Sequence, residues 1–376
     1  MTRILFLFIL TITTYCVQSQ NFYESYLPAN LESADSGTVS IHFYNNNFVK
    51  NNEYFGPYTE GITYIGTIIQ PEVSWSISDK FSLSAGWYLR YFYGKENFAQ
   101  SLPVIRARYT FLPGAQVIIG QLDGQLKHEY IEPIYNTDNY FSINPEYGVQ
   151  FLLDRKKLHV DFYMDWEHFL MPGDTDQEEI GGGLLATYSL KDQAEKRGLS
   201  IDFQSIIHHF GGQVDASENP IQTRSNIAGG LQYTFVPGLK MLDRITLSSF
   251  YIRAMELSHT NTIPFKSGFA THNTITFKNK WIQIGTGWFH GDDYFAPKAD
   301  YLFQSVSQFG DFYTTKGRDL ITSKFLFGNE ITKGVTLSIR YESYFDLQRK
   351  WNDFSYGLNI SVNEKVFERK PKGKKN

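Results

Sequence analysis

Residues 157–168 read KLHVDFYMDWEH, and apolar and polar side chains alternate along the whole stretch. Such a period of two is typical of a β-strand with unlike faces. One face of this strand carries apolar side chains, namely Leu158, Val160, Phe162, Met164 and Trp166. The other face carries polar ones, including Asp161, Asp165 and Glu167. The stretch therefore predicts a strand between an apolar and a polar environment.

The same alternation recurs along the chain, for example at residues 80–93 and 335–342. Most of the candidate strands have about ten residues or more, the length of a tilted membrane crossing. The candidate strands lie near residues 38–48, 65–78, 80–93, 102–111, 115–122, 146–154, 157–170, 180–191, 199–212, 224–236, 245–257, 269–279, 281–291, 319–328, 335–346 and 351–363.

The connections between these strands alternate in length. Tight turns, such as Pro113-Gly114 and Pro237-Gly238, are followed by longer polar loops, such as residues 123–145 and 292–318. Short turns on one side and long loops on the other are typical of outer-membrane barrels. We predict an all-β, antiparallel transmembrane β-barrel of roughly 16 strands (14–18), with short periplasmic turns and long outer loops.

The N-terminus predicts export. Arg3 precedes an apolar run at residues 4–12, which is too short to span a bilayer. We predict a cleaved signal peptide at residues 1–19, a barrel at residues 20–363 and a basic periplasmic tail at residues 364–376. The expected location is a bacterial outer membrane. Cys16, the single cysteine, lies in the signal segment, which excludes cysteine chemistry in the mature chain.

Composition supports strands and argues against nucleic acid as a partner. The chain has 376 residues, of which 25 are Tyr and 31 are Phe, and aromatic residues favour strands. The net charge of -4 gives no attraction to a polyanion. Trp75, Trp166, Trp281 and Trp288 are expected in aromatic girdles at the membrane surfaces, although stacking on sugars is an alternative.

This pattern of strands and loops resembles bacterial outer-membrane porins, and the aromatic strands resemble those of Bacteroidota. The resemblance is one of architecture and involves no sharp motif. In general porins the third outer loop folds into the lumen, and residues 123–145 are the third outer loop of this chain. The sequence leaves open whether this loop enters the lumen. The basic tail departs from barrels that end on an aromatic residue.

A barrel of this size encloses water, so its polar faces are expected to line a channel. Arg90, Arg106 and Arg108 are expected to form a cationic patch, and Asp161, Asp165 and Glu167 an acidic ladder. Arg340 and Glu342 lie on a further inward face. We predict these eight as pore-lining residues, with solvated wall residues as the alternative to a substrate site.

No pattern predicts catalysis, a cofactor or a metal. His208 and His209 are adjacent, so their side chains point to opposite faces of a strand and cannot share one ion. GxSxG and HExxH motifs are absent from the sequence. We therefore expect that the protein is not an enzyme, with no catalytic, cofactor-binding or metal-binding residues.

The leading functional hypothesis is a porin-like channel for diffusion of small hydrophilic solutes. One alternative is a barrel component of a nutrient-uptake or secretion assembly that acts by binding, and another is a barrel-embedded hydrolase. The expected partners are outer-membrane lipid and small hydrophilic solutes, with a homo-oligomer left open.

Overall fold

The computed structural model describes residues 35–192, 197–212, 217–259 and 262–371. The predicted signal peptide at residues 1–19 lies outside the described residues. Within the described ranges, no helix is both long enough and apolar enough to cross a membrane.

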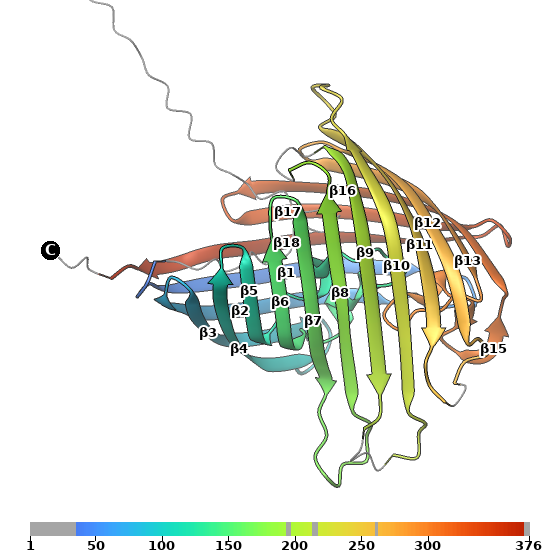
Figure 1. The fold of residues 1–376 in the computed structure, drawn as a ribbon, viewed down its shortest axis with the longest axis horizontal. Helices are drawn as coiled ribbons and strands as arrows, with labels where there is room; N and C mark the ends of the chain where they lie inside the picture. The colour runs from blue at the N-terminus through green and yellow to red at the C-terminus, as the bar shows by residue number, and fades with distance from the viewer. Residues whose placement is uncertain (1–34, 193–196, 213–216, 260–261, 372–376) are drawn as a thin grey trace, which may run out of the picture.

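Sixteen strands of the described chain form one closed antiparallel barrel, which confirms the predicted fold and strand number. Each barrel strand pairs with the barrel strands that precede and follow it along the chain, and β1 pairs with β18 to close the ring. The strands are β1 (Val39–Glu53), β2 (Thr63–Ser78), β3 (Phe81–Phe92), β4 (Gln100–Leu112), β5 (Ala115–Gln121), β6 (Tyr147–Asp154), β7 (Leu158–His168), β8 (Glu179–Ser189), β9 (Gly198–Phe210), β10 (Gln222–Phe235), β11 (Arg244–Glu256), β12 (Ser267–Lys278), β13 (Ile282–Asp292), β16 (Gly317–Thr332), β17 (Val335–Asp346) and β18 (Asn352–Arg369). In Figure 1, β6–β10 run steeply across the view, whereas β17, β18 and β1 lie at a wide angle to them.

Alternation places apolar side chains on the outer surface. On β7, Phe162 and Met164 are exposed, whereas Asp161 and Asp165 are buried. The outward face of each strand meets lipid, so apolar residues are favoured there. The four tryptophans expected in girdles all lie on this exposed surface.

Connections also follow the expected alternation. Two or three residues join β2 to β3, β4 to β5 and β6 to β7, whereas residues 122–146 and 293–316 form the two longest connections. Both described ends of the chain lie on the short-turn side, because β1 begins there and β18 ends there. One boundary differs from the expectation, since β18 continues to Arg369, which pairs with Val39. Residues 364–369 therefore extend the barrel wall and are not part of a tail.

The two longest connections fold into the barrel. We call residues 122–146 the first inner loop, and it contains η2 (Gln125–His128) and α1 (Asn139–Ser142). We call residues 293–316 the second inner loop, and it contains η4 (Tyr301–Phe303) and the hairpin β14 (Val306–Ser307) and β15 (Gly310–Thr314).

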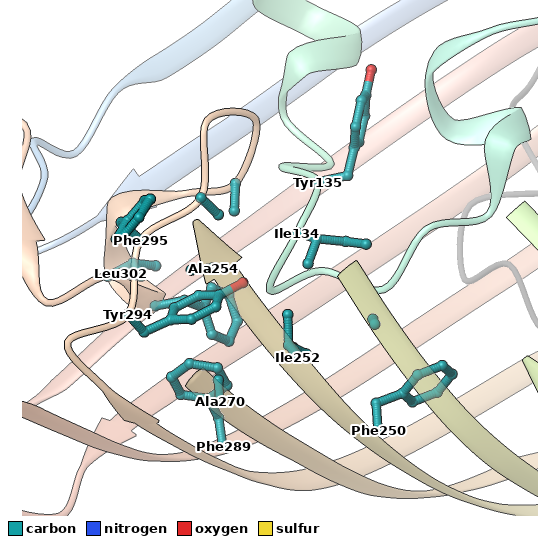
Figure 2. Packing of buried hydrophobic residues seen from close by; sticks show 14 of the residues in the cluster. Ile134, Tyr135, Phe250, Ile252, Ala254, Ala270, Phe289, Tyr294, Phe295 and Leu302 are labelled. Carbon is teal, nitrogen blue, oxygen red and sulfur yellow. The ribbon is translucent and has the colours of Figure 1, made fainter. Parts of the chain in front are cut away.

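Buried apolar clusters hold these loops against opposite walls. Ile134 and Tyr135 of the first inner loop belong to a cluster with Phe250 and Ile252 of β11 and with Phe303 of the second inner loop. Figure 2 shows Ile134 and Tyr135 above Phe250 and Ile252, with Tyr294 of the second inner loop beside them. A second cluster joins Leu126, Tyr140 and Phe141 to β1–β4. The first inner loop therefore crosses the lumen, a point that the sequence left open.

Candidate functional site in the barrel interior

Ion pairs fix the first inner loop to the wall formed by β1, β16 and β17. Asp138 Oδ1 lies 2.6 Å from Arg340 Nη2, and Asp138 Oδ2 lies 3.6 Å from Lys50 Nζ. Glu132 Oε2 lies 2.5 Å from Lys324 Nζ, and its other oxygen accepts a hydrogen bond from the Tyr344 hydroxyl. These groups are largely removed from solvent, so each charge needs its partner.

The start of the first inner loop is fixed to β4. Asp123 Oδ2 lies 2.6 Å from Arg108 Nη2, and Asp123 Oδ1 lies 3.9 Å from Arg106 Nη1. Burial alone would raise the pKa of Asp123, but Arg108, Lys127 and Arg106 hold it well below its usual range. Arg106 Nη1 also lies 3.5 Å from Glu72 Oε1 on β2. Both arginines are therefore paired with carboxylates, and they do not present a free cationic surface.

Arg90 is separate from these two arginines. Its guanidinium donates a 2.9 Å hydrogen bond to the Ser142 carbonyl and a second to the Ile143 carbonyl, at the end of the first inner loop. In the β3–β4 register Arg90 faces Gln100, whereas Arg106 faces Ser84. The expected patch of three arginines is thus divided, because the residues sit at different heights along paired strands.

His128, in η2, is held between two carboxylates. Nδ1 lies 2.7 Å from Asp161 Oδ2 and Nε2 lies 2.6 Å from Glu146 Oε2, while the ring stacks on Tyr163. Burial alone would lower the pKa of His128, but the two carboxylates outweigh it and raise the pKa to about 10. Both ring nitrogens therefore donate, and the imidazolium fastens the loop to β7 rather than serving as a base.

A second histidine lies near the long-loop end of the barrel. His208 Nε2 on β9 is 3.3 Å from Glu167 Oε1 on β7 and 3.1 Å from Glu179 Oε1 on β8. Lys298 of the second inner loop pairs with the other oxygen of Glu167. Glu179 is the most accessible of the three cluster residues, with 30% of its side chain exposed. We call Glu167, Glu179 and His208 the rim cluster.

The eight residues predicted from sequence lie on inward faces, and all are buried except Glu167, which is partly buried. Arg340 and Glu342 belong to the group around Asp138, and Asp161 contacts His128. Asp165 accepts a hydrogen bond from the Tyr147 amide, and Glu167 belongs to the rim cluster. Their role as the lining of a conducting pore stays a prediction.

Sequence reasoning missed three groups that the fold brings together. His128 sits in a loop without periodicity, and Glu179 was taken as part of a polar connection. His208 was considered as a metal ligand only together with the adjacent His209. The β7–β8–β9 register, in which Gly181 faces both Asp165 and His208, places Glu167 near His208. The rim cluster places one histidine nitrogen and two carboxylate oxygens within 4.8 Å of one another, a grouping that could hold a metal ion. The expectation of no metal-binding residues stays a prediction.

A cavity of about 150 Å³, lined by both polar and apolar side chains, remains between the first inner loop and the wall from β9 to β16. Its wall includes Gln204, Gln232, Thr274 and Lys324, and Tyr130 and Glu132 of the loop cover it. His272 also lines it and is buried. The cavity provides hydrogen-bonding groups to a small polar molecule.

Solved structures with the same fold are outer-membrane proteins. A loop-deletion mutant of OmpT from Vibrio cholerae aligns with a TM-score of 0.52 and 11% identity, over 88% of this chain and 100% of that one. OprD from Pseudomonas aeruginosa aligns with a TM-score of 0.50 and 10% identity, over 90% and 97% of the two chains. At such identities the likeness concerns the fold alone. The protein has the fold of outer-membrane β-barrels.

A family model described as lipid A 3'-O-deacylase-type matches residues 31–370. The chain belongs to this family. No curated protein matches the chain. The family is one of enzymes, so the expectation that the protein is not an enzyme is wrong. No short motif indicates an enzyme, because the barrel brings its titratable groups together from strands and loops that are far apart in sequence.

Proposed function

We propose that the protein hydrolyses an ester-linked acyl chain of an outer-membrane lipid of the lipid A class. The observation that carries this proposal is the family match over residues 31–370, because it spans all sixteen strands. The family match therefore covers the barrel itself. In the reaction, water adds to the ester carbonyl, the bond to the sugar oxygen breaks, and a fatty acid and a free hydroxyl are released.

The rim cluster is the best-placed group for this chemistry. The ester bonds of a lipid lie near the membrane surface, and the long loops of outer-membrane barrels face the outside. Glu167, Glu179 and His208 lie at that end, and Glu179 is open to solvent. A carboxylate there can take the proton of the attacking water. His128 cannot do so, because carboxylates occupy both of its nitrogens.

Lipid analysis tests the proposal. The full chain would be expressed in the outer membrane of a Gram-negative host that lacks such an activity, and lipid A would be analysed by mass spectrometry. We expect a species that has lost one acyl chain. Glu179→Gln should abolish that species, whereas Glu60→Gln, an exposed carboxylate in another long loop, should not. Unchanged lipid A in cells with folded protein would contradict the proposal.

Diffusion of small hydrophilic solutes is a second candidate function. The cavity beneath the first inner loop favours it, because its lining offers hydrogen-bonding groups to a small polar solute. Conductance in planar bilayers tests this candidate. A stable open state of the unaltered protein would support it, and a permanently closed barrel would exclude it.

A further inference from the structure

The cavity beneath the first inner loop has a wall of small uncharged side chains. Inward positions on five adjacent strands are paired one to the next around the ring, and they form a single row: Gln232, Ser248, Thr274, Gly287 and Thr322. All of them except Gly287 line the cavity. A Cβ on Gly287 would lie 2.8 Å from Thr274 Cγ2, so this glycine leaves room for the threonine side chains. The row therefore offers hydroxyl and amide groups to the cavity and carries no formal charge.

His272 lines the same cavity and makes no hydrogen bond through its ring. It is only 7% exposed, and neither ring nitrogen has a hydrogen-bond partner among the described residues. On the two neighbouring strands it is flanked by Phe250 and Phe289. An uncharged imidazole offers one N–H donor and one acceptor nitrogen, the pair that a hydroxyl group can use. Leaving such groups unsatisfied is costly, so a polar molecule in the cavity would be stabilised by them.

The charged groups at the wall of the cavity already have partners. Glu132 Oε2 lies 2.5 Å from Lys324 Nζ, which also lies 3.5 Å from Glu342 Oε1. A charged molecule would compete with these pairs, and burying it without a partner of its own would be costly. The lining therefore favours an uncharged molecule with several hydroxyl groups. Gln125 and Glu129 also line the cavity and are partly exposed, so a solute has access to it.

The size of the cavity and its aromatic residues suit a ring-shaped molecule. Its volume is about 150 Å³, and a cavity of this size accepts benzene, so one six-membered ring can enter. Tyr130 and Tyr135 of the first inner loop and Phe250 of β11 contribute aromatic surface to it. The two tyrosine rings are stacked, with their centroids 6.0 Å apart. Aromatic surface with a few placed polar groups is the usual composition of a small-molecule site.

We propose that this cavity is a binding site for one neutral cyclic polyol of monosaccharide size. Its hydroxyl groups would bond to His272 and to the row that contains Ser248 and Thr274, while its C–H face packs on the tyrosines. The site goes beyond the proposed hydrolysis, because the cavity can be occupied whether or not an ester is cleaved. It also differs from a diffusion path, because a binding site saturates.

Saturation-transfer NMR on the purified full chain tests the proposal, in lauryldimethylamine oxide, a detergent without a sugar headgroup. The probes are D-glucose and myo-inositol at millimolar concentration, and we expect saturable transfer to both. Glucuronate, and glucosamine in mildly acidic buffer, add a charge of either sign to such a ring and should bind at least about tenfold more weakly. His272→Phe and Thr274→Val should each weaken binding by about fivefold, the loss expected for one hydrogen bond. His272→Phe removes no hydrogen bond within the described chain, so the barrel should tolerate it.

The control is Thr271→Val, the same substitution on the outward face of β12, where Thr271 is paired with the exposed Tyr251. It should bind both probes as the unaltered protein does. Circular dichroism would show that each variant is folded. Absence of saturable transfer, binding that is unaffected by both His272→Phe and Thr274→Val, or equal binding of the charged sugars would overturn the proposal. Binding is measured without lipid, so its failure is distinct from failure of the hydrolysis.

Discussion

Asp138 Oδ1 of the first inner loop lies 2.6 Å from Arg340 Nη2 of β17, and both side chains are almost completely buried. The pair joins the middle of a loop that begins at β5 to β17, which is six strands away from β5 round the ring. It therefore helps to determine whether the lumen is closed.

Removing Arg340 should loosen the first inner loop. We expect Arg340→Ala to lower the free energy of unfolding by about 3–5 kcal/mol, because Asp138 is left buried with less compensation. Urea unfolding in detergent measures this, and planar-bilayer recordings should show more frequent openings. Arg253→Ala, at an exposed position on β11, should stay within about 0.5 kcal/mol of the unaltered protein. Equal effects of the two substitutions would contradict the assigned role.

The His128 imidazolium should make stability depend on alkaline pH. Its pKa is raised to about 10, from 6.5, so its contribution is fully present below 6.5 and is lost as pH rises through 10. We expect the thermal midpoint of the unaltered protein to fall towards that of His128→Gln between pH 7 and pH 10.5. Lys127, whose pKa burial lowers to about 8, titrates in both proteins, so the difference isolates His128. A difference that does not change with pH would show that His128 is uncharged.

Asp300 should produce a pH dependence in the acid range. Burial, with the charges of Asp138 and Glu132, raises its pKa from 3.8 to about 7, although the Leu302 amide donates a hydrogen bond to it. Its contribution to stability is therefore present at low pH and is lost as pH rises through 7. Asp300→Asn keeps an oxygen acceptor for Leu302. We expect this variant to gain stability relative to the unaltered protein from pH 4 to pH 8 in thermal melts, and a constant difference would contradict the assignment.

Gly120 should be essential for the pairing of β5 with β4. Its φ is +101°, and a Cβ there would lie 2.0 Å from the Ile105 carbonyl oxygen. Gly120→Ala should cost at least about 1–3 kcal/mol from backbone strain alone, and should lower the yield of folded barrel. Gly229→Ala on β10 is the matched control, because a Cβ there meets no atom within 4 Å. Folded yields measured after identical refolding would separate the two, and equal yields would show that β5 tolerates the strain.

Much of the barrel could be predicted because strand alternation is a local signal. The faces of β7 follow directly from residues 157–168, and the outward tryptophans follow from the same rule. The end of β18 was misjudged, because charged residues such as Glu368 are compatible with both a strand edge and a tail. Only pairing with β1 distinguishes them.

The candidate site was less accessible to prediction. The inward positions of Arg106, Arg108 and Glu167 could be read from periodicity, but their partners could not, since those partners come from loops and from other strands. Asp123 pairs with two of the arginines, and His208 joins Glu167 only through the register of three strands. The absence of a local motif was therefore no guide to the activity of the family.

The sequence by itself determined the class of fold, because a period of two and alternating loop lengths are properties of neighbouring residues. Tertiary structure alone decided that the lumen is crossed by the first inner loop, and that Asp138 meets Arg340 and His208 meets Glu167. Those contacts depend on the order in which strands close into a ring and on their register. A shift of one residue would turn each inward side chain towards the lipid.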